Sequence, residues 1–122
     1  MADNFEKLAV WKKAHELVIE VYRLTKNFPS EEKYSLTDQV RRSAASVPTN
    51  IVEGNERQGK KEYLQFLYIA KGSLIETRYH LLLAKDLGYL KPGDYDSISS
   101  KSLEVAKMLN GLINFIKSSA PL

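Results

Sequence analysis

Cysteine is absent from the 122-residue chain, which excludes disulfide scaffolds, thiol catalysis and cysteine-ligated zinc or iron–sulfur sites. The chain also lacks any run of about 18 uncharged apolar residues, so we expect no transmembrane helix. The first residues include Asp3 and Glu6 and lead into no apolar segment, so we expect no secretory signal and a cytoplasmic location. The net charge of +3 is compatible with nucleic acid but does not identify it as a partner.

Proline and glycine are scarce, with four and six residues, and the clearest interruptions of the helical pattern fall at 27–31, 58–60 and 88–93. Strand signals are missing, because no segment alternates apolar and polar residues and no Asn-Gly or Asp-Gly turn joins two β-rich runs. The segments between the breaks place apolar residues three or four apart, as in Leu8, Trp11, Ala14 and Val18. We therefore predict one all-α domain over 1–122, an antiparallel up-down-up-down four-helix bundle with helices at about 4–26, 31–57, 60–87 and 94–118.

Pro48 lies inside the second predicted helix, where it removes a backbone hydrogen bond and crowds the carbonyl of Ala44. The apolar stripe keeps its phase through Ala44, Val47 and Ile51, so we predict one kinked helix rather than two. At the end of the third helix, Gly88 suits a C-terminal stop.

Polar residues flank the apolar stripe of the second helix. Antiparallel pairing with the third helix brings Arg41 or Arg42 level with Glu76, and Ser46 level with Lys71 or Gly72. The small residues at this level, Ala44-Ala45-Ser46 and Gly72-Ser73, predict a close crossing, closed by an Arg–Glu pair. One interpretation is a structural network that fixes the register of the bundle, made of Gln39, Arg41, Arg42, Ser46, Asn50, Glu53 and Glu76. The alternative is a ligand or RNA site that uses Arg41, Arg42 and Asn50.

The third predicted helix has two apolar faces, whereas a four-helix bundle needs one broad face from each helix. The first face includes Leu67, Leu74 and Leu81. The second is rotated by roughly 120° on a helix of 3.6 residues per turn, and it is made of Leu64, Tyr68, Ile75, Tyr79 and Leu82. Because aromatic residues are enriched in interface cores, this second face predicts self-association. The alternative is that the surplus face widens contact with the two neighbouring helices.

The motifs predict no catalytic, cofactor or metal site. The segment from Gly54 to Lys61 imitates a phosphate-binding loop, but Lys61 stands where Ser or Thr must hold magnesium and no strand precedes it. Glu76 and His80 are spaced i, i+4, unlike the Glu-x-x-His pairs of di-iron bundles. We therefore expect no enzyme and no metalloprotein.

The densest basic patch is expected at one corner of the bundle, with two further lysines on the first helix. The candidate nucleic-acid residues are Lys12, Lys13, Arg57, Lys60 and Lys61. One chain supplies few cations for phosphate contacts, and a solvated surface is the alternative interpretation. A symmetric oligomer repeats the patch, so self-association and binding to RNA or DNA are linked hypotheses.

The chain resembles the small four helix bundle protein family, which is also known from proteins encoded in intervening sequences of bacterial large-subunit rRNA genes. Four sets of residues carry the resemblance over nearly the whole chain: Leu8 with Trp11; Phe28-Pro29 with Glu31 or Glu32 and Tyr34; Leu36, Gln39, Arg41-Arg42-Ser43-Ala44, Ser46-Val47-Pro48, Asn50-Ile51 and Glu53-Gly54; and Ala70, Gly72-Ser73 and Glu76.

The resemblance implies a four-helix bundle that assembles as a ring-like homopentamer. Relatives include the accessory variability protein of diversity-generating retroelements, which is basic and works with a reverse transcriptase and nucleic acid. The leading functional hypothesis is therefore a non-enzymatic assembly protein whose basic surface engages RNA or a nucleic-acid enzyme such as a reverse transcriptase. The alternative is a structural protein–protein interaction module that makes no contact with nucleic acid.

Overall fold

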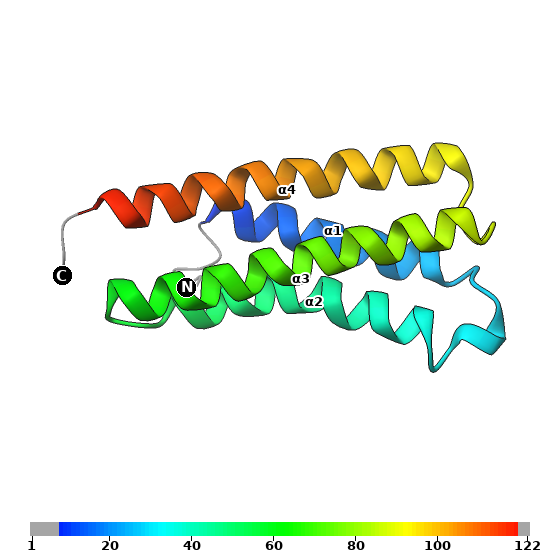
Figure 1. The fold of residues 1–122 in the computed structure, drawn as a ribbon, viewed down its shortest axis with the longest axis horizontal. Helices are drawn as coiled ribbons and strands as arrows, with labels where there is room; N and C mark the ends of the chain where they lie inside the picture. The colour runs from blue at the N-terminus through cyan, green and yellow to red at the C-terminus, as the bar shows by residue number, and fades with distance from the viewer. Residues whose placement is uncertain (1–7, 120–122) are drawn as a thin grey trace.

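The computed structural model describes residues 8–119. Four α-helices follow one another along the chain, α1 (Ala9–Thr25), α2 (Leu36–Asn55), α3 (Lys60–Asp86) and α4 (Pro92–Ser118), and a short 3₁₀ turn, η2 (Ser30–Glu32), precedes α2. In Figure 1, α1 and α3 run in one direction while α2 and α4 run in the other. Contacts join α1 to α2 and α4, and α3 to the same two helices, so α1 and α3 lie diagonally across the bundle. The predicted all-α, antiparallel four-helix bundle is confirmed.

The core forms because each helix turns one apolar stripe inward. Its largest fully buried side chains come from all four helices: Leu17 and Val21; Val40, Val47 and Ile51; Leu67, Leu74 and Leu81; and Ile98, Val105 and Leu109. Spacings of three, four and seven residues keep each stripe on one side of its helix. Burying one such side chain stabilises the fold by about 1.5–3 kcal/mol before the entropy cost of folding.

The third helix ends where the glycine predicted it. Gly88 has a positive φ of 83° and follows the last helical residues of α3. The Gly88 N–H donates to the Lys85 carbonyl at 3.0 Å, and the Tyr89 N–H donates to the Ala84 carbonyl at 2.8 Å. These two bonds form a Schellman motif, which satisfies carbonyls that the helix itself leaves free.

Other helix ends differ from the predicted ones. The second helix begins at Leu36 rather than near residue 31, because the chain after Pro29 makes the η2 turn and Ser35 has non-helical backbone angles. The fourth helix begins at Pro92, since proline lacks the N–H that a first helical residue cannot pair. The predicted start of the first helix at residues 4–7 lies outside the described residues.

Pro48 lies within α2, which continues on both sides of it. The prediction of one helix through Pro48 is therefore confirmed. Pro48, Val47 and Ala44 are all buried, so packing on this side of α2 compensates for the hydrogen bond that the proline cannot make.

The crossing of α2 and α3 corrects part of the sequence prediction. Ser46 faces Ser73, with the two hydroxyl oxygens 2.8 Å apart, rather than Lys71 or Gly72. Gly72 is exposed and a Cβ added there would meet nothing within 4 Å. The close approach lies instead at Gly54, where a Cβ would come within 2.9 Å of the Tyr63 ring.

None of the described helices combines the length and apolar character that a bilayer crossing requires. Within residues 8–119, no group of three or more histidine, aspartate or glutamate side chains is placed to hold a metal ion.

Candidate functional site

The second apolar face of α3 is exposed along the length of the helix. Tyr68, Ile75, Tyr79 and Leu82 have exposed fractions of 47%, 59%, 59% and 38%. Leu64 is half-buried and packs against the core at the same side of the helix. We call Leu64, Tyr68, Ile75, Tyr79 and Leu82 the α3 face. Four of these five residues are exposed, so contact with the neighbouring helices does not cover the α3 face.

The α3 face has the composition of an interaction surface. Single exposed apolar residues are common on proteins, but a continuous row with two tyrosines is typical of interface cores. A hollow of about 430 Å³ lies between Leu64, Tyr68 and the stems of Lys60 and Lys61 at one end of the face. Such a hollow could receive an apolar side chain from a partner.

Sequence reasoning missed a second exposed apolar site on α1. Ile19 is 58% exposed and Tyr22 is 43% exposed. We call these two residues the α1 patch. The Arg41 guanidinium lies 4.7 Å from the centroid of the Tyr22 ring, which holds that ring against α2. Ile19 is an apolar residue outside the inward stripe of α1, and this position in the sequence was the signal that could have revealed the patch. The α1 patch and the α3 face lie on helices that do not touch each other.

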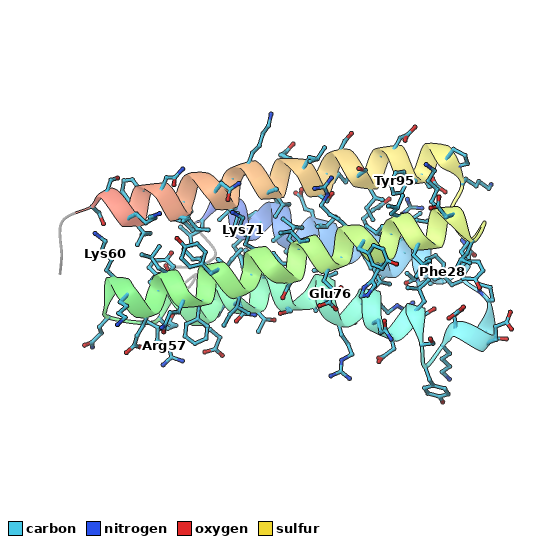
Figure 2. The ribbon with its side chains drawn as sticks, viewed as in Figure 1. Phe28, Arg57, Lys60, Lys71, Glu76 and Tyr95 are labelled. Carbon is cyan, nitrogen blue, oxygen red and sulfur yellow. The ribbon has the colours of Figure 1, made fainter. Side chains whose placement is uncertain are left out.

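Three of the candidate nucleic-acid residues lie together at the end of the bundle where α2 turns into α3, and Figure 2 shows Arg57 and Lys60 there. We call Arg57, Lys60 and Lys61 the basic corner. Arg57 pairs with Glu53 at 3.4 Å and lies 4.8 Å from the centroid of the Phe66 ring. The Lys60 ammonium donates to the Ser119 carbonyl at 2.8 Å. Lys61 is exposed and has no ion pair within residues 8–119.

A tyrosine beside the basic corner is half-buried. The Tyr63 hydroxyl donates to the Asn55 side-chain oxygen at 3.4 Å. Burial raises the pKa of Tyr63 above its ordinary value, because the charged phenolate would lose its hydration. Tyr63 therefore stays neutral near the three cations of the corner.

The structure places the other two candidate cations elsewhere. Lys12 and Lys13 belong to α1, the helix diagonal to α3. The Lys13 ammonium lies 3.2 Å from Glu104 and 3.7 Å from Glu16. The hydrogen bond and the charge of Glu104 raise the pKa of Lys13 above its ordinary value. Lys13 is therefore engaged by acids of α1 and α4, whereas the basic corner lies where α2 turns into α3.

The predicted polar network of α2 is only partly assembled. Asn50 donates to the Ser46 hydroxyl at 2.9 Å, and Ser46 in turn bonds Ser73 on α3. The predicted Arg–Glu pair across the crossing is wrong. Arg41 instead donates to the Thr25 hydroxyl on α1. The other charged members pair with residues four positions away along the chain: Arg42 with Asp38, Glu53 with Arg57, and Glu76 with His80. Gln39 is exposed, and its side chain makes no hydrogen bond within the described residues.

The reason for this difference is geometric. Arginine at position 41 faces α1, and position 42 is exposed, so neither side chain crosses toward α3. The exposed Arg42–Asp38 pair, at 3.8 Å, contributes little stability because solvent screens it.

A buried polar cluster between α2 and α3 was missed. The Thr77 hydroxyl lies 2.8 Å from the Ser43 hydroxyl, and Ser43 lies 3.4 Å from Nδ1 of His80. All three residues are buried. The Ser43 hydroxyl also donates to the Val40 carbonyl, so it acts in packing and is closed to a substrate. The sequence signal that could have revealed this cluster is that Ser43 and Thr77 occupy positions in the apolar stripes of their helices.

The comparisons with known proteins agree with this architecture. The family model described as 23S rRNA-intervening sequence protein matches residues 6–111. No curated protein matches the chain. A solved structure of a protein of unknown function from the S23 ribosomal protein family of Bacteroides thetaiotaomicron is similar, with a TM-score of 0.80 and 30% identity, and the match covers 86% of this chain and 98% of that one. The chain therefore belongs to the 23S rRNA-intervening sequence protein family.

Proposed function

We propose that the protein is a non-enzymatic assembly protein whose copies join through the α3 face into a closed ring. The observation that carries this proposal is the row of exposed apolar side chains on α3, including Ile75 and Tyr79 at 59% exposure each. Removing such a row from water is the main driving force for association between proteins. We expect this assembly to act in the cytoplasm.

The positions of the two apolar surfaces favour a ring over a symmetric dimer. A two-fold dimer needs one surface that pairs with itself, whereas a ring needs two different surfaces on each chain. The α3 face and the α1 patch, with Ile19 exposed at 58%, lie on diagonal helices and supply two such surfaces. The family resemblance favours five copies.

A basic surface on this ring is proposed to engage RNA or a nucleic-acid enzyme such as a reverse transcriptase. Each chain carries a net charge of +3, so five copies carry +15. The basic corner repeats around the ring and provides the several cations that phosphate binding requires. The family description refers to 23S rRNA, which supports RNA as the polymer to test first.

The test of the ring compares substitutions on the two surfaces by sedimentation velocity and native mass spectrometry. We expect the parent chain to sediment as one closed oligomer, with five copies by mass. Both Ile75→Glu, on the α3 face, and Ile19→Glu, on the α1 patch, are expected to weaken association by at least about a hundredfold, because each places a charge in a dry contact. Ile69→Glu is the matched control, since Ile69 is 52% exposed on α3 but outside the α3 face.

Mixing the two variants gives a sharper result. In a ring, the intact α3 face of the Ile19→Glu chain still fits the intact α1 patch of the Ile75→Glu chain, so the mixture should form a one-to-one complex. A symmetric dimer predicts that Ile19→Glu has no effect. A monomeric parent chain at micromolar concentration contradicts the whole proposal.

A further inference from the structure

Arg78 is unlike the other arginines of the chain. The other four each contact a partner within the chain: Arg23 with Glu20, Arg41 with Thr25, Arg42 with Asp38, and Arg57 with Glu53. Within residues 8–119, Arg78 makes no ion pair or hydrogen bond, although its side chain is half-buried. No side-chain nitrogen or oxygen within residues 8–119 is both buried and without a partner, so the Arg78 guanidinium is open to solvent. Its N–H groups are therefore available to a ligand from outside the chain.

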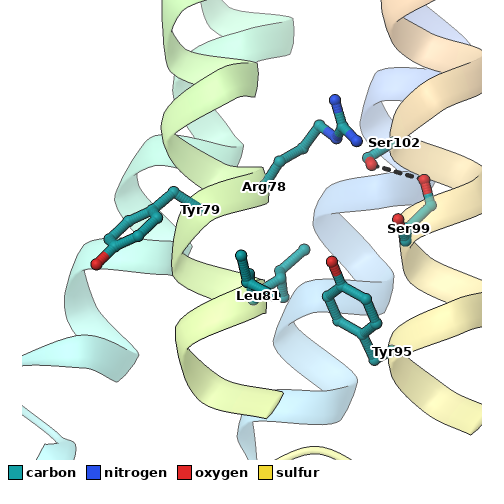
Figure 3. Close-up of a pocket in the computed structure, with 7 residues that line it drawn as sticks. Arg78, Tyr79, Leu81, Tyr95, Ser99 and Ser102 are labelled. Carbon is teal, nitrogen blue, oxygen red and sulfur yellow. Dashed lines mark hydrogen bonds between the residues drawn. The ribbon is translucent and has the colours of Figure 1, made fainter. Parts of the chain in front are cut away.

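Arg78 lines a cavity of about 240 Å³ between α3 and α4. Figure 3 shows its guanidinium reaching from α3 toward Ser102 on α4, with the Tyr95 hydroxyl directed to the same side. Ser102 uses its hydroxyl proton to bond the Ser99 carbonyl at 2.7 Å. The hydroxyls of Ser99 and Tyr95 have no hydrogen-bond partner within the described residues and are available as donors.

The cavity presents donors and cations but no acid. No aspartate or glutamate lines it. The Lys85 ammonium lies 4.9 Å from the centroid of the Tyr95 ring and places a second positive charge beside the cavity. Leu81 and Leu82 form the apolar side and keep the donors partly shielded from water. A guanidinium with adjacent hydroxyls is the arrangement that binds oxyanions.

We propose that this cavity binds a phosphate group, carried by a small phosphorylated molecule or by a nucleic-acid backbone. Phosphate fits better than carboxylate because its additional acceptor oxygens can use the guanidinium and both hydroxyls at once. This phosphate site is separate from the basic corner, which is the surface proposed to bind nucleic acid. Two residues of the α3 face, Tyr79 and Leu82, border the cavity.

The experiment uses inorganic phosphate as the probe and follows its ³¹P NMR line width at constant ionic strength. We expect saturable broadening with the parent chain and at least about tenfold weaker binding with Arg78→Gln, because a charge-assisted hydrogen bond is lost. Lys71→Gln is the matched control, since Lys71 is an exposed cation on the same helix without an ion pair within residues 8–119. Tyr95→Phe, which keeps the ring and removes only the hydroxyl, should weaken binding several-fold.

Competition identifies the source of the phosphate. Displacement by a 5′-mononucleotide indicates a small phosphorylated ligand, and displacement by an oligonucleotide without a terminal phosphate indicates a nucleic-acid backbone. Equal broadening in the parent chain and Arg78→Gln overturns the proposal. If Arg78→Gln instead changes the sedimenting mass, then Arg78 pairs with an acid of a neighbouring copy, which overturns the phosphate site but is compatible with the proposed ring.

Discussion

Two helical glycines, Gly54 and Gly111, differ in what a side chain would meet. At Gly54 an added Cβ would lie 2.9 Å from Cδ1 of Tyr63 and 3.0 Å from Cβ of Phe66. The first contact is with a ring that can turn slightly, but the second is with an atom fixed to the backbone of α3. At Gly111 an added Cβ meets nothing within 4 Å. The missing side chain of Gly54 therefore permits the spacing of α2 and α3.

We expect Gly54→Ala to destabilise the protein by about 1–3 kcal/mol, because an extra methyl group in a packed contact forces neighbouring atoms apart. The control Gly111→Ala should be neutral or stabilise by up to about 1 kcal/mol, since alanine favours helix more than glycine. Urea unfolding followed by circular dichroism measures both. Equal effects at the two positions would contradict the steric role of Gly54.

At the scale of the helices, α2 and α3 are joined by hydroxyl contacts as well as by the apolar core. Ser46 bonds Ser73, and about one turn farther from the connecting loop Ser43 bonds Thr77, each at 2.8 Å. Within residues 8–119, every fully buried side-chain nitrogen or oxygen has a hydrogen-bond partner. Because a buried hydroxyl without a partner is costly, these contacts penalise any shift of α2 along α3.

Thr77→Val tests this role because valine keeps the shape of threonine and removes the hydroxyl. We expect a loss of about 1–3 kcal/mol in the free energy of unfolding, since Ser43 loses a partner inside the bundle. Thr49→Val is the matched control, because the Thr49 hydroxyl is exposed and bonds only the Ala45 carbonyl of its own helix. Calorimetry compares the two variants. If both lose the same stability, the buried contact contributes nothing beyond helix propensity.

The four helices could be predicted because each depends on residues close together in the sequence. Apolar spacing marks the inward stripes, and Gly88 marks a helix end through its own backbone angle. The Arg–Glu pair and the crossing at Gly72 could not be predicted reliably, because they depend on how far one helix slides along another. That distance is set by Tyr63 and Phe66 against Gly54, which are contacts between helices and leave no periodic pattern in the sequence.

The same distinction applies to the candidate surfaces. The α3 face follows from spacing on one helix, and four of its five predicted members are exposed. Lys12 and Lys13 were expected on the first helix, apart from the basic corner, but the pairing of Lys13 with Glu104 of α4 is a contact between helices that the sequence does not show. The cavity at Arg78 depends on residues of α4 that gave no motif.

At the scale of the whole molecule, the small net charge of +3 hides an uneven distribution. Many cations are neutralised locally, as Lys13 is by Glu104 and Arg23 by Glu20. Lys61 at the basic corner has no ion pair within the described residues. Binding to a polyanion therefore depends on repeating the basic corner in an assembly.

We expect the assembled protein to bind single-stranded RNA at low salt and to lose affinity steeply as salt rises. The logarithm of the binding constant falls with the logarithm of salt concentration by about 0.7 for each phosphate neutralised on a single strand. Replacing Lys60 and Lys61 together by glutamate should abolish binding. Fluorescence anisotropy with labelled RNA at several salt concentrations measures the affinity and its slope.

The matched control replaces Lys26 and Lys33 by glutamate, which changes the net charge equally but acts in the connection between α1 and α2, away from the basic corner. If that pair weakens RNA binding as much as the Lys60 and Lys61 pair, net charge rather than the corner determines affinity. If the parent ring binds neither RNA nor DNA at low salt, the nucleic-acid hypothesis fails and the protein–protein interaction module is favoured. The proposed ring survives that outcome, because the burial of the α3 face proposed to drive its assembly requires no polyanion.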